Sequence, residues 1–157
     1  MLSMLVPVIT LLALLGSGTM AGLFFAYSNS VMPALAKLPA PQGIAAMNHI
    51  NVVIQNPLFL AIFMGTALLA LILIAAALSG WSARPSWVLI GAGLYLAGNI
   101  VVTVTINVPM NEALAASSEG QGGIALWATF LDRWVFWNHV RAAACTGALA
   151  AFAMAIR

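Results

Sequence analysis

Long stretches without a charged residue are the feature that most constrains how this 157-residue chain can fold. No Asp, Glu, Lys or Arg occurs before Lys37, none between residues 38 and 83, and none between residues 85 and 111. Only 5% of the residues are charged and 64% are hydrophobic, whereas about a quarter of the residues of a soluble domain are charged. A free-standing soluble protein is therefore excluded, and we expect the chain to lie in a lipid bilayer.

These three stretches, together with the apolar residues 134–156 around Arg141, predict four transmembrane helices, because a helix needs about 20 apolar residues to cross the hydrocarbon core. Lipid offers no partner to a free backbone amide, so each span must be helical. The prediction is one all-α domain over residues 1–157, an integral membrane four-helix bundle. The predicted spans are residues 4–27, 58–78, 87–106 and 134–156. The first has no basic flank and is longer than the apolar region of a signal peptide, so we expect it to be a span.

The link between the first two predicted spans also contains a helix. Residues 43–55 place Met47, Asn48, Asn51 and Gln55 on one helical face. A second long link, residues 107–133, contains a glycine-rich turn region at 117–123 and all three acidic residues. Both long links lie on the side of the membrane opposite the chain ends. We expect the ends to be cytoplasmic and the protein to lie in a bacterial inner membrane.

The two halves of the chain resemble each other in short polar strings. NHIN at residues 48–51 precedes the second predicted span, and NHVR at 138–141 opens the fourth. Proline-containing strings at 31–35 and 108–110 follow the first and third spans. Two helical hairpins related as parallel repeats would produce this pattern, and chance similarity is the alternative. If the two hairpins are related as repeats, His49 and His139 occupy equivalent positions.

Arg141 is the most informative polar residue. It lies about 10 Å into the last predicted span, counted at 1.5 Å per residue from residue 134. A charge at this depth costs a few kcal/mol and normally faces the bundle with a partner. Arg141 is therefore a candidate for holding an anionic ligand or transition state. The alternatives are extension of its side chain to the interface, or an ion pair with Asp132 or Glu112.

The two histidines, His49 and His139, are candidates for proton transfer. Histidine can accept and release a proton near neutral pH, so either could act as a general base. Each could instead form interfacial hydrogen bonds to the backbone. Together, the two imidazoles could also ligate haem iron or copper.

Asparagines and aromatic residues complete the set of candidates. Amide groups must find partners when they are buried, so we expect Asn29 and Asn99 to end helices or to form interhelical hydrogen bonds. For Asn51, Asn107 and Asn111 two roles stay open: they could form such interhelical hydrogen bonds, or they could line a polar pocket. We expect Pro109 to interrupt the helix in this region. An aromatic group lies near the start of the last predicted span: Trp127, Phe130, Trp134 and Trp137. These side chains could form an aromatic belt at the membrane interface, or they could stack on a flat ligand.

Several common chemistries have no motif in the sequence. There is no phosphate-binding Walker loop, HExxH or CxxC motif, or GxSxG elbow. The three carboxylates are too few for a di-iron site. A redox reaction here would therefore use no bound metal, or a metal held by very few ligands.

Four ordered strings resemble those of a known family. They are FAYSNSVMPAL at 25–35, MNHIN at 47–51 with NPLF at 56–59, NVPMN at 107–111, and WVFWNHVR at 134–141. Over about residues 16–157 the chain resembles the anthrone oxygenase-like integral membrane family. This resemblance implies a small four-helix membrane protein. Fungal relatives oxidise an anthrone to an anthraquinone with O₂, without flavin or metal.

The resemblance also implies roles for individual residues. A base removes a proton from the anthrone methylene, and the resulting enolate reduces O₂. His139 would be the base, with His49 as a second candidate, and Arg141 would stabilise the enolate oxygen. Hydrogen bonds to the substrate would come from Asn51, Asn107, Asn111 and Asn138, and stacking surfaces from Trp134 and Trp137. No metal site is implied.

The expected partners are a small lipophilic aromatic substrate and the lipid bilayer, and nucleic acid is not among them. Small residues on the third predicted span, Gly91, Gly93 and Ala97, would allow close helix contact in a homo-oligomer. Two other functions stay open. One is a haem- or copper-binding membrane protein that uses His49 and His139. The other is a non-enzymatic carrier or accessory protein for a lipophilic ligand.

Overall fold

The computed structural model describes residues 2–117 and 121–157, and this part of the chain contains helices and their connections, with no strand. Four helical stretches within it are long and apolar enough to cross a membrane: Leu5–Leu35, Pro57–Leu78, Pro85–Ala116 and Gly123–Ile156. The prediction of an all-α integral membrane protein with four spans is confirmed. Residues 118–120 of the predicted turn region lie outside the described residues.

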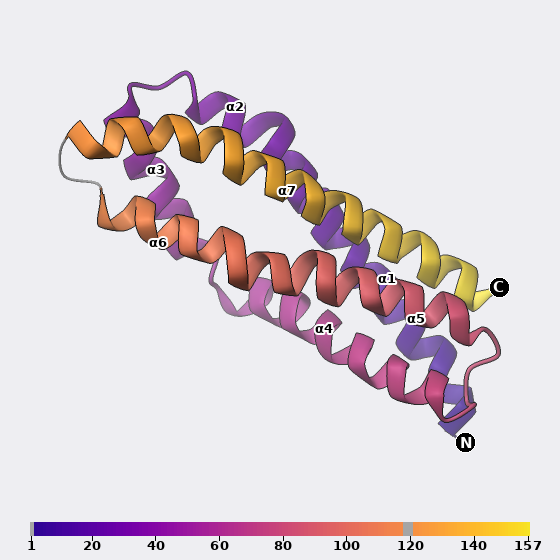
Figure 1. Cartoon of the computed structure of the whole chain (residues 1–157). Coiled ribbons are helices and arrows are strands. Elements are labelled where there is room, and N and C mark those ends of the chain that lie inside the picture. Colours follow the sequence, from indigo (N-terminus) through magenta and orange to yellow (C-terminus); the bar gives the residue numbers. More distant parts are fainter. Residues whose placement is uncertain (1, 118–120) are drawn as a thin grey trace.

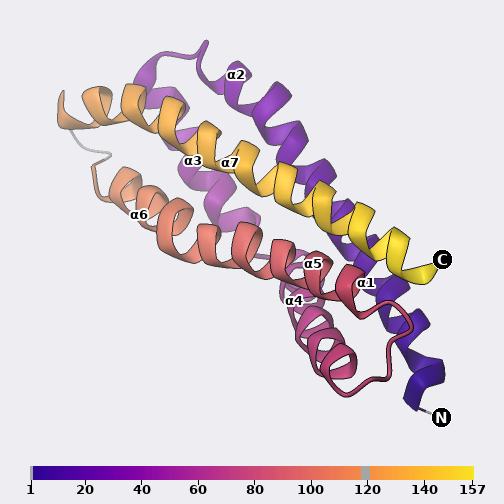
Figure 2. The same cartoon turned by 45° about the vertical axis from the view of Figure 1, so that its right-hand side comes forward.

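Both chain ends lie at the same end of an elongated bundle (Figure 1). In this half of the molecule α1 packs against α4 and α7, and α5 packs against the same two helices. In the other half α3 packs against α6 and α7 (Figure 2). The α-helices are α1 Leu2–Ala26, α2 Met32–Leu35, α3 Ala40–Val53, α4 Pro57–Leu78, α5 Pro85–Tyr95, α6 Val108–Ala116 and α7 Gln121–Ile156. The π-helical segments are η1 Tyr27–Val31, η2 Leu96–Val101 and η3 Thr103–Asn107.

Three of the four helices extend beyond the predicted spans. The first continues through η1 and α2, the third continues through η2 and η3 into α6, and α7 begins before residue 134. The additional turns carry apolar side chains that pack together instead of forming polar loops. The predicted helix at 43–55 is confirmed as α3. Asn56 begins α4, because its side chain accepts a hydrogen bond from the Phe59 amide at 3.0 Å.

The expected interruption at Pro109 does not occur. The π-helical segment η3 ends two residues before Pro109, and the Val108 N–H reaches the Thr103 carbonyl. In the first half of the chain η1 ends two residues before Pro33, and the Met32 N–H reaches the Tyr27 carbonyl. A π-helical turn changes the hydrogen-bond register, which lets the helix continue past a residue without an N–H. This shared arrangement favours two related hairpins.

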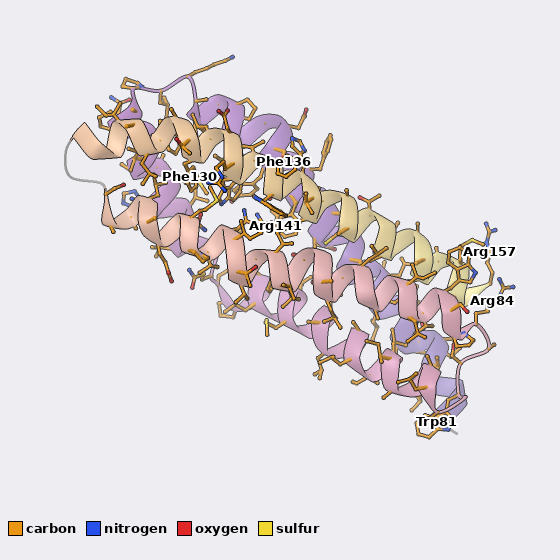
Figure 3. The ribbon with its side chains drawn as sticks, in the orientation of Figure 1. Trp81, Arg84, Phe130, Phe136, Arg141 and Arg157 are labelled. Atoms are coloured by element: carbon orange, nitrogen blue, oxygen red, sulfur yellow. The ribbon has the colours of Figure 1, made fainter. Side chains whose placement is uncertain are left out.

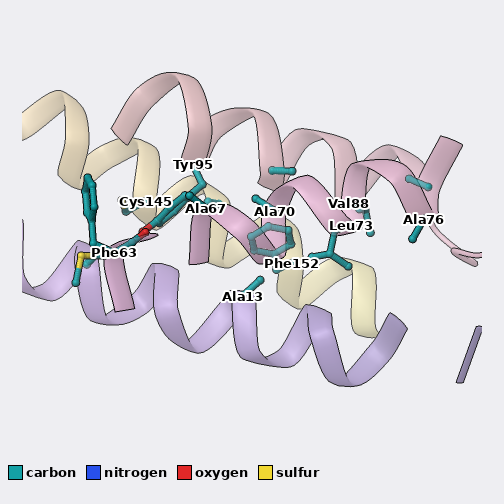
Figure 4. Packing of buried hydrophobic residues seen from close by; sticks show 14 of the residues in the cluster. Ala13, Phe63, Ala67, Ala70, Leu73, Ala76, Val88, Tyr95, Cys145 and Phe152 are labelled. Carbon is teal, nitrogen blue, oxygen red and sulfur yellow. The ribbon is translucent and has the colours of Figure 1, made fainter. Parts of the chain in front are cut away.

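A tightly packed core joins the helices in the half that contains the chain ends (Figure 4). Small side chains on α1 and α4, including Ala13 and Ala70, let large ones such as Phe152 and Tyr95 fit between the helices. The Tyr95 hydroxyl donates a hydrogen bond to the Phe63 carbonyl at 2.9 Å, so its polar group is satisfied within the bundle.

Gly91 contributes to this core and not to an external surface. A methyl group at residue 91 would lie 2.8 Å from the buried Phe152 ring, whereas one at Gly93 would meet nothing within 4 Å. Of the small residues considered for self-association, Gly91 therefore packs against Phe152 of the same chain and is not free to contact a second copy. Gly93 and Ala97 face outward.

This difference makes Gly91→Ala and Gly93→Ala a matched pair. Both variants gain helix propensity, up to about 1 kcal/mol. Only Gly91→Ala must displace a packed ring, and overpacking costs about 1–3 kcal/mol. We expect thermal unfolding in detergent to occur at a lower temperature for Gly91→Ala than for Gly93→Ala. Equal unfolding temperatures would contradict the packing of α5 against α7.

A second core lies in the other half of the molecule. It contains the buried apolar residues Met32, Leu35, Ile44, Met47, Leu114, Trp127, Phe130 and Trp134. The Phe130 ring stacks between the rings of Trp127 and Trp134, with centroid separations of 5.6 and 5.9 Å. These contacts hold α2, α3, α6 and the first turns of α7 together beyond the end of α4.

Candidate functional site

A cavity of about 550 Å³ lies between the two cores. Its walls come from the end of α1, from α3, from the first turns of α4, from η3 and α6, and from α7. The volume falls in the range of about 300–1,000 Å³ that is typical of small-molecule sites. The cavity is therefore large enough for an organic ligand.

The backbone is irregular around this cavity. Helix α3 ends at Val53 and α4 begins at Pro57, so residues 54–56 form a non-helical connection between them. Ile54 and Gln55 of this connection line the cavity. The π-helical segment η3 faces it with Thr103 and Val104. Irregular backbone in a membrane protein is tolerated where it is buried in protein or lines a cavity, and π-helical turns are frequent at functional sites.

Arg141 reaches this cavity from α7 and points into the bundle (Figure 3). Its side chain is only 6% exposed. One terminal nitrogen donates to Asn138 Oδ1 at 2.6 Å, and the other donates to Thr103 Oγ1 at 3.2 Å. Asn138 in turn donates through Nδ2 to the Phe24 carbonyl and to Ser28 Oγ, both at 2.7 Å. The guanidinium is thus fixed by a network that connects three of the four spans.

The charge of Arg141 has no acidic partner among the described residues, so neither Asp132 nor Glu112 forms the ion pair considered above. Aromatic rings stabilise the cation in its place. The guanidinium carbon lies 4.3 Å from the centroid of the Phe24 ring and 5.3 Å from that of Trp134. Cation–π contacts compensate part of the desolvation cost. A buried cation without a counter-ion attracts an anionic ligand.

Several polar atoms around the cavity are buried without a hydrogen-bond partner in the protein. They are Asn48 Oδ1, Asn51 Nδ2, Asn111 Oδ1, Trp134 Nε1 and Arg141 Nε. Most buried polar groups in native proteins are hydrogen-bonded, so each unpaired atom requires an explanation. Here all five atoms belong to residues that line one cavity.

The cavity lies in the half of the bundle opposite the chain ends. Arg141 is about 24 Å from Arg157 along the helix at 1.5 Å per residue, and the hydrocarbon core is about 30 Å thick. Arg84 and Arg157 lie at the end of the bundle that contains the chain ends (Figure 3). With a membrane boundary at these residues, Arg141 would lie within the hydrocarbon core, near its other side.

The structure brings five of the predicted site residues together. Asn51 on α3, Asn111 on α6, and Trp134, Asn138 and Arg141 on α7 all line the same cavity. The three residues of α7 share one face because they are spaced by four and three positions.

Four other predicted site residues do not line this cavity. His139 is exposed on α7, and Trp137 packs edge to face against Phe136. Asn107 is buried, with neither amide atom hydrogen-bonded, but it does not reach the lining. His49 is exposed and lines an adjacent hollow of about 280 Å³, which shares Tyr27, Ile50 and Ile54 with the cavity. Its Nδ1 lies 2.8 Å from the Ala45 carbonyl oxygen.

Sequence reasoning did not assign a site role to several residues of the lining. Phe24 and Tyr27 provide ring surfaces, Thr103 fixes Arg141, and Glu112 adds a carboxylate. Glu112 follows the predicted Asn111 directly, and Asn48 shares a face with Asn51, so local spacing contained a signal for both. Phe24 and Thr103 come from other spans, and only the fold places them beside Arg141.

No metal site is found in the described part of the chain, where no three His, Cys, Asp or Glu side chains form a group that could hold a metal ion. Neither of the two cavities described above is lined by both histidines. The arrangement that a haem or copper ion would need, with His49 and His139 facing one another, has no support in this geometry.

The fold and cavity define a class: helical proteins with four candidate membrane spans and a cavity between them that a buried guanidinium lines. In a comparison with protein families, residues 58–151 match the anthrone oxygenase family. The chain belongs to this family, as the ordered strings indicated. No curated protein and no solved structure matched in the corresponding searches.

Proposed function

We propose that the protein is a membrane-embedded oxygenase that uses O₂ to oxidise an anthrone-like or other phenolic aromatic, without flavin or metal. The observation that carries the proposal is the buried guanidinium of Arg141, which has no acidic partner among the described residues and lies in a cavity with aromatic walls. Membership of the anthrone oxygenase family supports the same reaction type.

The proposed chemistry takes its electrons from the substrate. Loss of a proton from the methylene carbon leaves an electron-rich enolate, whose oxygen carries the negative charge. The enolate reduces O₂ and forms a carbon–oxygen bond, and loss of water then gives the carbonyl. The net change converts CH₂ and O₂ into C=O and H₂O. Because the substrate is the reductant, no additional redox cofactor is needed.

Arg141 would stabilise the charge that develops on the enolate oxygen. Its guanidinium is held before the substrate arrives, by Asn138 on one side and Thr103 on the other. Donors that are fixed in a site with little water stabilise developing charge strongly, because they need no reorganisation during the reaction. The Asn51 amide would donate to another oxygen atom of the substrate, the Asn111 amide oxygen would accept from a substrate hydroxyl, and the Trp134 ring would contact the fused rings.

A lipophilic substrate would enter from the bilayer. Leu60 and Met64 on α4, and Val104 and Val108 on the opposite wall, line the cavity and are also exposed on the outside of the bundle. The cavity is therefore open between these two walls, on an apolar surface. Molecular oxygen and tricyclic phenols both partition into bilayers, so an opening on this surface suits both.

Met64→Trp tests this entry route. The larger side chain should narrow the opening and raise KM for a lipophilic substrate by about tenfold, which corresponds to 1.4 kcal/mol, with kcat unchanged. Leu68→Trp is the matched control, because Leu68 is exposed on the same helix but does not line the cavity. Identical KM values for the two variants would exclude this opening as the entry.

The proposed activity is tested by incubating metal-free, flavin-free protein in lipid nanodiscs with emodin anthrone and O₂. We expect anthraquinone to form faster than in protein-free nanodiscs, with one O₂ consumed for each product. A rate equal to the spontaneous oxidation would remove this substrate from the proposal. A haem or copper absorption band lost on changing either histidine would favour a metalloprotein.

A further inference from the structure

The lining of the cavity contains one carboxylate, that of Glu112. Glu112 lies on α6, on a face that also contributes Val108, Asn111 and Ala115 to the lining. These four residues follow the spacing of a single helical face, so the position of Glu112 follows from the same register that places Asn111 at the cavity. Asn111 is already a candidate for binding the substrate.

Glu112 and Arg141 face the same cavity without contacting each other. Glu112 forms no ion pair with any basic side chain in the described ranges, 2–117 and 121–157. Arg141 is buried, whereas Glu112 is exposed. The cavity is therefore lined by a buried, fixed cation and by an exposed carboxylate, with space for a ligand.

Neither histidine lines the cavity that Glu112 and Arg141 line. A general base must come within about 2.6–3.2 Å of the proton that it removes, directly or through one water molecule. His49 lines the other hollow, and His139 is exposed on a different face of α7 from Arg141. A substrate whose oxygen contacts Arg141 lies in the cavity that Glu112 lines and that neither imidazole lines.

We infer that Glu112 is the general base of this site, in place of the histidines; the inference rests on the proposed function. In the first step the methylene C–H bond breaks, the proton moves to the Glu112 carboxylate, and the electron pair stays on the substrate as the enolate. The enolate oxygen is bound by Arg141. After O₂ is reduced and the C–O bond forms, Glu112 returns its proton to the peroxide oxygen. The second C–H bond and the O–O bond then break, the electron pair of the C–H bond forms the carbonyl, and the proton leaves with the outer oxygen as water.

The position of Glu112 suits this role in two respects. A general base must come within reach of the proton that it removes, and Glu112 lines the same cavity as Arg141. The opposite charges of Glu112 and Arg141 would also match the two ends of the reacting carbonyl system.

Proton removal can be measured separately from oxidation. Under anaerobic conditions, wild-type protein in nanodiscs should speed the exchange of the methylene protons of emodin anthrone with D₂O, followed by NMR. Glu112→Gln should lower the protein-dependent exchange rate by about 10²–10⁴-fold, the usual contribution of a positioned base. Substrate affinity, measured by quenching of tryptophan fluorescence, should be unchanged. Glu112→Asp should recover part of the exchange.

Asp132→Asn is the matched control, because Asp132 is an exposed acid on α7 that does not line the cavity. It should exchange protons at the wild-type rate. If Glu112→Gln binds the substrate and also exchanges at the wild-type rate, Glu112 is not the base. If the wild-type protein itself neither exchanges protons nor oxidises the substrate, the proposed function fails instead. Loss of exchange in His139→Gln, with Glu112→Gln still active, would return the role to an imidazole.

Discussion

Arg141→Gln should lower the turnover of an anthrone substrate by at least about 100-fold, the loss seen when one preorganised oxyanion donor is removed. Glutamine keeps an amide that can contact Asn138, but it removes the cation that the Phe24 and Trp134 rings surround. The effect should be on kcat, because the negative charge develops on the substrate only after proton removal. Turnover is measured by O₂ uptake and by anthraquinone absorbance.

The matched control is Arg133→Gln. Arg133 lies on the same helix, is exposed, and does not line the cavity. We expect it to leave turnover unchanged. Arg141→Lys should give an intermediate rate, because lysine keeps the charge but cannot donate to Asn138 and Thr103 through a planar fork. If Arg141→Gln inserts correctly, retains its helical circular dichroism and turns over at the wild-type rate, the guanidinium has no part in the reaction.

Asn138→Leu should impair both the fold and the reaction. The amide of Asn138 donates to the Phe24 carbonyl and to Ser28, and accepts from Arg141. Leucine has a similar size but satisfies none of these groups, and each buried group left unpaired costs about 1–3 kcal/mol. We therefore expect a lower unfolding temperature. We also expect kcat to fall by about tenfold, equal to 1.4 kcal/mol, because Arg141 loses one of its two anchors.

Asn29→Leu serves as the comparison, because Asn29 is an exposed asparagine whose side chain contacts only Ser30, at 3.5 Å. Asn29→Leu should change neither the unfolding temperature nor kcat. A positioning role for Asn138 predicts that kcat falls while KM stays close to wild type. If stability falls but the kcat of the folded fraction does not, Asn138 supports the bundle alone and does not orient Arg141.

Helical periodicity already contained information about the histidines. Asn138 and Trp134 are three and seven residues before Arg141, so they share its face. His139 is two residues before Arg141, and two residues on an α-helix differ by about 200° in direction. Two side chains so placed cannot enter the same cavity from one straight helix. The pairing of His139 with Arg141 rested on their closeness in sequence, and the structure separates them.

Other parts of the site could not be predicted from local patterns. The apolar runs mark where lipid surrounds the chain, but three helices continue beyond them because their additional turns bury a second core. Proline alone predicted an interruption at Pro109, whereas the π-helical segment η3 lets the helix continue. Without that continuation α6 would not bring Asn111 and Glu112 beside α7.

The sequence by itself determined that the chain is a four-span helical membrane protein, because charge-free runs of this length have no other stable solution in water or lipid. It also determined the polar faces of α3 and α7, because helical spacing is local. Only the tertiary structure decided which faces meet. It placed Phe24, Thr103 and Glu112 around Arg141 and left both imidazoles outside the cavity. The physical reason is that the packing of large and small side chains between distant segments sets the rotation and overlap of the helices, and no local pattern specifies this packing.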